Sequence, residues 1–247
     1  ERRKKLMEEH DINLIYVNVH HRENNTWVGD DFFEKFNEDE FLFATTRKES
    51  LAQLDYFCEH LLQDFGTYQD AMHQDETNLF HARISFSLNV KLIDPAEVIE
   101  HAIAAYRKNS DRISLSQIEG FVRQILGWRE YIRGLYWKEM PQYKKKNELN
   151  NFGKLPAFYW TGKTKMNCLK NSIENSLEHA YAHHIQRLMI TGNFALLLQT
   201  NPDEVDDWYL GIYADAVEWV QLPNTRGMSQ YADGGILATK PYVSSCA

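Results

Sequence analysis

Three histidines and an arginine lie within ten residues of one another in the segment HAYAHHIQRL, residues 179–188. The ordinary pKa of histidine is close to physiological pH, so its imidazole can move a proton during a reaction. His179 and His183 have the i, i+4 spacing of a zinc site, but the glutamate of an HExxH motif is absent. Three interpretations stay open: core histidines with satisfied hydrogen bonds, a functional pair in which one imidazole protonates a substrate and the other anchors it, or a zinc site.

The spacing of apolar residues predicts that this segment belongs to a helix from about Asn167 to Thr191, ended by Gly192. His184 falls on the apolar face of that helix, and we expect its side chain to point inward. His183, the preceding residue, would lie on the neighbouring face of the helix. An inward histidine must be satisfied by hydrogen bonds or face a ligand.

Two further segments carry side chains suited to cofactor chemistry. FHARISFSLN, residues 80–89, combines a histidine, an arginine and two serines beside a turn, which suits a pyrophosphate or, without a ligand, an arginine-capped turn. Tryptophan and tyrosine recur between Trp128 and Trp219, either as core residues or as a chain of redox-capable rings. Cys168 falls in the first turn of the predicted helix, where the helix dipole favours a thiolate, although an iron–sulfur cluster normally needs four cysteines.

The composition of the 247-residue chain, with 43% hydrophobic residues, is that of a globular protein. It has no apolar run of about 18 residues, so we expect no membrane span. Its three cysteines are too scattered for a disulfide framework, which favours the cytoplasm. The formal net charge of −8 argues mildly against nucleic-acid binding, but residues 138–170 hold eight lysines and two acids. This stretch is either a solvated loop or a rim that faces phosphates.

The elements that must position these residues are helical at nearly every point from residue 46 onward. Residues 1–45 do not share this helical pattern and are predicted to be a remnant or linker. We also expect the chain to be cut at both ends. Residues 46–247 are predicted to form the helical domain. A phosphate-binding loop of the GxxxxGK[ST] type is absent from the sequence, which disfavours a nucleotide enzyme of that class.

Helix boundaries are predicted from glycine, proline and capping residues. Gly66 is predicted to end the first helix, and Pro95–Arg107 to form another. Ser116 with Glu119 has capping-box spacing before a long helix. Three glycines at intervals of seven in that helix favour close approach of a neighbouring helix or of a flat ligand. These glycines are Gly120, Gly127 and Gly134.

Seven segments together resemble the cryptochrome/photolyase superfamily, specifically the bacterial branch with an iron–sulfur cluster whose characterised members are prokaryotic (6-4) photolyases. They occur in the family order over about 200 residues. The segments are FGTYQDAM (65–72), FHARIS (80–85), EGFVRQILGWREYIRGLYW (119–137), LPAFYWTG with MNC (155–168), HAYAHHIQRLMITGNFALL (179–197), WYLGIYADAVEW (208–219) and LPNTRGMSQYADGG followed by KPYVSS (222–245).

The resemblance implies a mainly α fold: an all-helical FAD-binding domain of the photolyase type over residues 46–247, with a short irregular N-terminal remnant and no recognisable antenna domain. It implies light-driven, FAD-dependent repair of UV-induced pyrimidine dimers in DNA, with the damaged base flipped out of the duplex. The expected partner is damaged DNA, with no membrane, and the expected state is a monomer. The alternatives are a cryptochrome-like blue-light photoreceptor that keeps FAD and an aromatic electron relay, and a fragment that holds no cofactor.

The resemblance also assigns residues to roles. The active-site histidine pair falls on His183 and His184, with Met228 and Tyr242 nearby. The aromatic electron relay falls on Trp160, Trp208 and Tyr209. The expected FAD-binding residues are His81, Arg83, Ile84, Ser85, Gln124, Arg129, Asp215 and Gln221.

The chain departs from the family pattern at two places. Gln221 stands where this branch usually has a glutamate opposite the reactive flavin nitrogen, and an amide cannot be deprotonated. Cys168 matches the first of four ligands to a 4Fe-4S cluster, and the other three are expected beyond Ala247. We therefore expect this chain alone not to assemble the cluster. The sequence does not identify an antenna chromophore.

Overall fold

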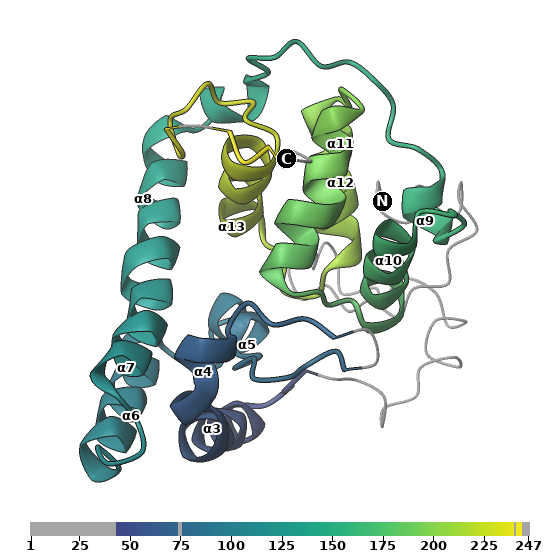
Figure 1. The fold of residues 1–247 in the computed structure, drawn as a ribbon. Helices are drawn as coiled ribbons and strands as arrows, with labels where there is room; N and C mark the ends of the chain where they lie inside the picture. Colours follow the sequence, from purple (N-terminus) through teal and green to yellow (C-terminus); the bar gives the residue numbers. More distant parts are fainter. Residues whose placement is uncertain (1–42, 74–75, 240, 244–247) are drawn as a thin grey trace. The chain divides into compact units, whose positions relative to one another are not determined.

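The computed structural model describes residues 43–73, 76–239 and 241–243 (Figure 1). The N-terminal remnant predicted for residues 1–45 lies outside them except for its last three residues. The described residues are mainly helical, as predicted, and their only β-type pairings are two isolated bridges. They divide into two compact units, a first unit of residues 43–146 and 217–224 and a second unit from residue 147 to 216 and from 225 onward.

The first unit contains most of the long helices. They are α3 (Arg47–Tyr56), the π-helical turn η2 (Phe57–Leu61), α4 (Leu62–Tyr68), α5 (Ser85–Asn89), α6 (Pro95–Lys108), α7 (Leu115–Val122), the π-helical turn η3 (Arg123–Arg129), α8 (Glu130–Glu139), the 3₁₀ turn η4 (Gln142–Lys145) and α13 (Glu218–Leu222).

Capping boxes define where these helices begin. Thr46 and Glu49 cap α3, and Asp94 and Glu97 cap α6, which has Pro95 in its first turn. The predicted start of α6 is confirmed. Such boxes satisfy backbone N–H groups that have no partner within the helix.

The capping box predicted at Ser116 and Glu119 is wrong by two residues. The box is formed by Ser114 and Gln117, and the Ser114 N–H donates to Gln117 Oε1 at 3.0 Å. The chain is extended at Ser114, so the helix begins at Leu115. Serines at both positions made the sequence signal ambiguous.

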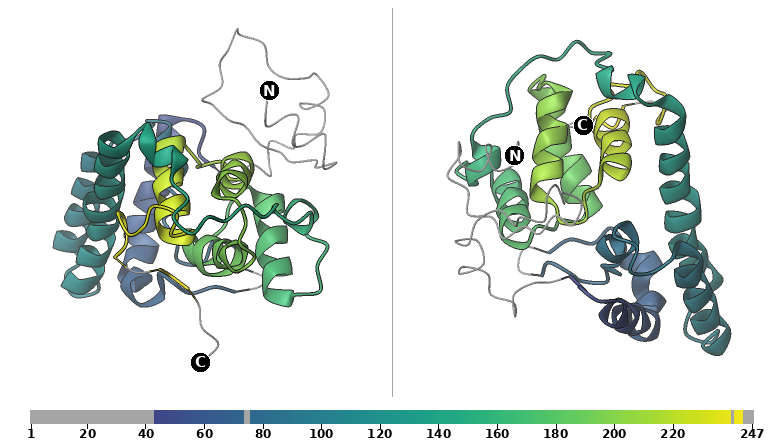
Figure 2. Two further views of the ribbon diagram at one scale, coloured as in Figure 1. Left: turned by 90° about the horizontal axis from the view of Figure 1, so that it is seen from above. Right: turned by 180° about the vertical axis from the view of Figure 1, so that it is seen from behind.

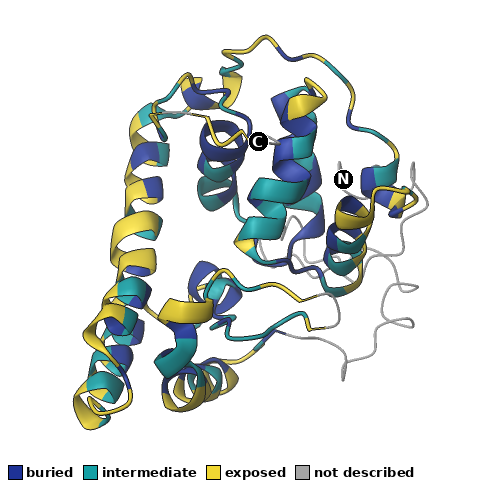
Figure 3. Cartoon of the chain, viewed as in Figure 1, coloured by how far each residue is buried: buried dark blue, intermediate teal, exposed yellow. Residues whose placement is uncertain are grey.

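Aromatic rings hold the core of the first unit together. Phe57 and Phe65 contact Phe121 with ring centroids 4.8 and 5.4 Å apart. All three are buried together with Leu54 and Leu62. The adjoining helix α8 has buried residues on one side and exposed residues on the other (Figure 3), and α13 packs against it (Figure 2).

The glycines of the first unit differ from the predictions. Gly66 does not end a helix, because α4 continues to Tyr68; a Cβ at Gly66 would lie 2.9 Å from Gln117 Cγ, so glycine allows α4 to approach α7. Gly120 and Gly134 have open space instead, with no atom within 4 Å of an added Cβ. A helix contact therefore does not explain these two glycines, and the flat-ligand interpretation stays open.

The second unit packs its helices around a core rich in tyrosine and tryptophan. Tyr159, Ile173, Trp208, Ile212 and Tyr213 are completely buried. Among the described residues, no helix has the length and apolar character that a membrane crossing requires. The helices are α9 (Phe158–Thr161), α10 (Asn167–His179), the π-helical turn η5 (Gln186–Gly192), α11 (Asn193–Leu197), α12 (Pro202–Ile212) and the π-helical turn η6 (Pro223–Ser229), which begins in the first unit.

Candidate functional site

The histidine segment is not one continuous helix. α10 ends at His179, because Ala180 adopts a left-handed conformation with φ of 49°. The Asn175 side-chain amide donates to the Tyr181 carbonyl at 2.9 Å, and the Ala214 N–H donates to the Ala180 carbonyl at 2.9 Å. These two bonds hold a break where the sequence predicted helix up to Thr191. Alanine carries no signal for a left-handed residue, so the break could not be read from the pattern.

Gly192 was predicted to end that helix, but helix continues through it into α11. An added Cβ at Gly192 would lie 2.8 Å from the Arg187 carbonyl oxygen and 3.0 Å from the Tyr209 hydroxyl, and would also meet Ser229. Glycine is required here for close packing, not for a turn.

His183 caps the helical segment that begins after the break. Its N–H donates to Gln186 Oε1 at 2.9 Å, and its Nδ1 accepts from the Ile185 N–H at 3.2 Å. This is the reciprocal arrangement of a capping box, with an imidazole in place of a hydroxyl. Because Nδ1 accepts a hydrogen bond, the proton of the neutral ring is on Nε2. The donor of the neutral ring is therefore Nε2, at the edge of the ring away from the cap.

His184 is exposed, which contradicts the prediction that it points inward; the break after His179 changes the face on which it lies. The protein packed around the imidazole nevertheless weakens its hydration. That desolvation, followed by the charges of Arg187 and His183, lowers the pKa of His184 from 6.5 to about 4. His184 is therefore neutral at physiological pH.

Arg187 and Asp215 form a bidentate ion pair next to the histidines, and the sequence assigned no role to this arginine. The two terminal nitrogens of Arg187 lie 2.9 and 3.2 Å from the two carboxylate oxygens of Asp215. The Arg187 guanidinium also stacks over the Tyr213 ring at 3.9 Å. Burial alone would lower the pKa of Arg187, but the charge and hydrogen bonds of Asp215, together with Tyr213 and Tyr181, raise that pKa overall. Asp215, a predicted cofactor-binding residue, therefore pairs with Arg187 through both of its carboxylate oxygens.

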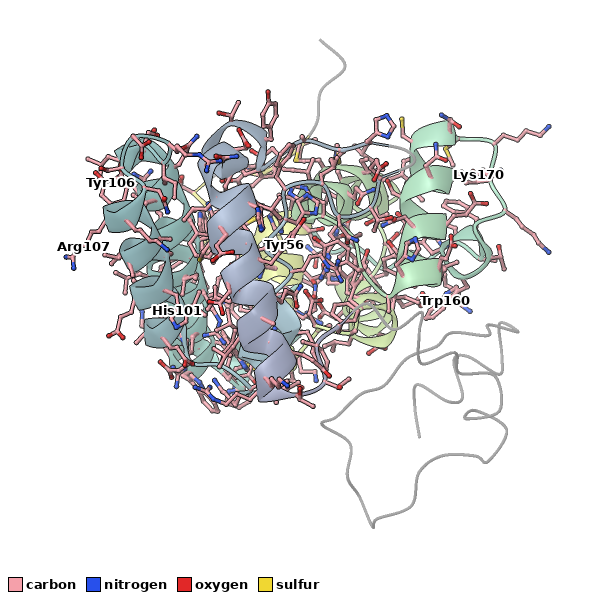
Figure 4. All side chains as sticks on the ribbon, turned by 90° about the horizontal axis from the view of Figure 1, so that it is seen from below. Tyr56, His101, Tyr106, Arg107, Trp160 and Lys170 are labelled. Atoms are coloured by element: carbon pink, nitrogen blue, oxygen red, sulfur yellow. The ribbon has the colours of Figure 1, made fainter. Side chains whose placement is uncertain are left out.

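The predicted relay residues Trp208 and Tyr209 are in ring contact, with centroids 5.1 Å apart. Both are buried, and the Trp208 indole donates to the Tyr159 carbonyl at 2.9 Å. Tyr159 and Tyr213 extend the cluster, at 5.3 and 5.8 Å from Trp208. Trp160, on α9 in Figure 4, belongs to the same buried core. The aromatic cluster is therefore larger than the sequence indicated.

Met228 and Tyr242, the remaining predicted catalytic residues, differ in their exposure to solvent. Met228 is buried in η6. Tyr242 lies in the short described segment 241–243 and is exposed. Their predicted roles beside the histidine pair stay predictions.

Seven of the eight expected cofactor-binding residues belong to the first unit, and Asp215 belongs to the second. Arg83 has a left-handed backbone with φ of 56°, and its carbonyl accepts from Gln53. Arg129 contacts Asn89 Oδ1 at 3.3 Å and stacks over Trp219 at 4.7 Å. Of the others, His81, Ile84 and Gln221 are buried, Ser85 begins α5 and Gln124 is exposed.

The chemistry of these donors fits a ligand with phosphates and a flat ring. Arg83 and Arg129 supply guanidinium groups, which pair well with phosphate oxygens. Gln124 supplies an exposed amide, and Gly120 and Gly134 leave open space on the same run of helix. The donor set therefore agrees with the cofactor that the resemblance implies.

The zinc interpretation receives no support. Among the described residues, no group of three or more histidine, cysteine or carboxylate side chains is arranged to hold a metal ion. The break after His179 removes the shared helix face on which the His179 and His183 pairing depended. Cys168 is a free, exposed cysteine in the first turn of α10.

The lysine-rich stretch contributes to both units. In the second unit, Lys163, Lys165 and Lys170 line a shallow hollow together with Thr164 and Glu174. The three lysines are exposed, and Lys170 lies on α10 in Figure 4. Lys170 pairs with Glu174 at 3.8 Å. The hollow has a net positive charge in an acidic chain.

Comparisons with known proteins identify relatives of this chain, although no family model matches it. A (6-4) photolyase of Agrobacterium fabrum is 53% identical over 205 residues, which are 83% of this chain and 40% of that relative. An uncharacterized protein of Acanthamoeba polyphaga mimivirus, R853, is 33% identical over 112 residues, covering 45% of this chain and 84% of that protein.

A solved structure has the same fold. The class III photolyase from Agrobacterium tumefaciens superposes with a TM-score of 0.68 at 20% identity, over 83% of this chain and 42% of that one. This likeness confirms the predicted mainly α, photolyase-type fold. The chain spans about two fifths of the length of both photolyases.

Proposed function

Because this chain belongs to the bacterial branch of the cryptochrome/photolyase superfamily, we propose that it serves the light-driven, FAD-dependent repair of (6-4) photoproducts in DNA. The observation that carries the proposal is the 53% identity to a (6-4) photolyase over 83% of the chain. The histidine pair that the resemblance assigned to the lesion supports it. In this proposal, residues 46–247 are the FAD-binding domain, and the protein acts in the cytoplasm.

FAD would be held by Arg83 and Ser85 at its phosphates and by Gln124 and Arg129 along the long helix. Bound FAD supplies the light absorption and the electron for the damaged base. Gln221 would stand beside the flavin as a neutral amide. Asp215 would act through Arg187, with which it is already paired. Trp208 and Tyr209, in ring contact, would carry electrons within the buried aromatic cluster.

The two histidines would have different roles at the lesion. His183, with its proton on Nε2, would donate a hydrogen bond that anchors the flipped-out base. His184 is neutral before substrate binds, because its pKa is about 4. The phosphates of a bound nucleotide would raise that pKa, since a nearby negative charge favours the imidazolium. Substrate binding would thus prepare His184 to transfer a proton.

The first test is an absorption spectrum of the purified chain after incubation with FAD, in the dark and under blue light with a reductant. The proposal predicts oxidised-flavin absorption that bleaches in light, because the buried cluster supplies electrons. Trp208→Phe should slow the bleaching, whereas the matched control Trp137→Phe, at a residue that is 69% exposed, should not. A colourless chain would contradict the proposal.

A blue-light photoreceptor without repair activity is the second candidate. Gln221 favours it, because this branch usually has a glutamate at that position and the buried amide cannot exchange a proton with the flavin. Both candidates predict photobleaching. Only the repair proposal requires His184 for activity on damaged DNA.

A further inference from the structure

Arg187 joins three separate segments of the second unit at the break between α10 and η5. Its Nε donates to the Ala182 carbonyl at 2.8 Å, one residue before the histidine pair. Its two terminal nitrogens bind Asp215, which follows α12. Its own N–H donates to the His183 carbonyl at 3.0 Å. The side chains of Arg187 and Asp215 are only 14% and 10% exposed.

We propose that Arg187 is a positioning residue for the histidine pair: it clamps residues 181–183 to Asp215 and thereby fixes where both imidazoles stand. The clamp itself is independent of the reaction. Its importance for repair rests on the proposed function, which gives the histidines their task.

The geometry requires arginine and not merely a positive charge. Three nitrogens of one planar group make three directed bonds, to one backbone carbonyl and to both oxygens of one carboxylate. The flat face of the same group lies on Tyr213 at 3.9 Å and faces Tyr181 at 5.8 Å. A lysine ammonium is a point charge that can neither span the carbonyl and the carboxylate in this way nor stack.

The position of Arg187 also has an electrostatic effect on His184. Desolvation and the Arg187 charge, with a contribution from His183, keep the His184 imidazole neutral. Asp215 balances the guanidinium charge through the bidentate ion pair. Arginine at this position therefore supplies both the clamp and a charge, and the two effects can be separated by substitution.

The test compares Arg187→Lys and Arg187→Met with the unsubstituted chain by amide hydrogen exchange and by NMR titration of the histidine rings. Both variants lose the three guanidinium hydrogen bonds to Ala182 and Asp215. The amides of Ile185 and of residue 187 should therefore exchange roughly ten to a hundred times faster, as expected when hydrogen bonds to a charged group are lost. The pKa of His184 should rise in Arg187→Met and stay low in Arg187→Lys, which keeps the charge. Arg133→Met, an exposed arginine of α8, is the matched control.

Two outcomes would overturn the proposal: unchanged exchange at residues 183–187 in both variants, or an equal increase across α12, which would indicate a general loss of stability. If Arg187→Met does not fold, Asp215→Asn removes the partner's charge at nearly constant size and should loosen the same amides. These measurements need neither FAD nor DNA. A chain that fails to repair DNA but shows the local loosening would reject the proposed function and keep the clamp.

Discussion

His183 has a structural role in addition to the chemical one expected of it. Its Nδ1 and its N–H cap the helical segment that carries His184 and Arg187. A substitution that removes the imidazole therefore also removes a cap, and the two effects must be separated before any loss of repair is assigned to chemistry. Asparagine is a good N-cap residue and has no imidazole.

At the residue scale we predict different stabilities for two variants of His183. His183→Ala should lower the free energy of unfolding by about 0.5–2 kcal/mol, the usual cost of losing an N-cap. His183→Asn should stay close to the unsubstituted chain. Urea unfolding measures both values. Equal stability of His183→Ala and the unsubstituted chain would show that the cap contributes nothing.

At the scale of the elements, π-helical turns occur where the proposed site residues lie. Gln124 and Arg129 belong to η3, Arg187 to η5 and Met228 to η6. A π-helical turn widens the helix by one residue and often occurs at functional sites. Each such turn also shifts the face on which the following residues lie, so a constant period of 3.6 residues misplaces them.

Gly192 provides the prediction for this scale. Gly192→Ala should lower the free energy of unfolding by about 1–3 kcal/mol, because the Cβ would collide with the Arg187 carbonyl and the Tyr209 hydroxyl. Gly134→Ala is the matched control in open space and should raise stability by about 0.5–1 kcal/mol through its better helix propensity. Thermal unfolding distinguishes the two. A neutral Gly192→Ala would contradict the close packing described for η5.

The sequence predicted the helical fold and the start of α6 because capping residues, proline and apolar spacing are local signals. It missed the break at Ala180, because the bonds that hold this break come from Asn175 and from Ala214, which is 34 residues further on. It missed the role of Arg187 for the same reason: its partner Asp215 is 28 residues away. The histidine pair was identified by resemblance, but its orientation required the structure.

At the scale of the whole molecule, an acidic chain must bind an acidic polymer if the proposed function is correct. The formal net charge is −8, so a local positive surface has to face the phosphates. Lys163, Lys165 and Lys170 around the hollow of the second unit are the proposed contact.

We predict that replacing these three lysines by glutamine reduces the salt dependence of binding to undamaged duplex DNA. The slope of log K against log salt should become shallower by about 2 to 3, at roughly 0.9 per phosphate contact. Fluorescence anisotropy at several salt concentrations measures it. The control replaces Lys48, Lys91 and Lys108, which are also exposed. The same slope change in both triple variants would show that only total charge matters.

The most direct test of the central claim is repair of a DNA duplex that carries one (6-4) photoproduct, measured with the FAD-loaded chain under blue light and in the dark. We expect restored bases in light only, and loss of that activity in His184→Gln without loss of flavin photobleaching. Photobleaching without any repair in the unsubstituted chain would contradict the claim and favour a photoreceptor.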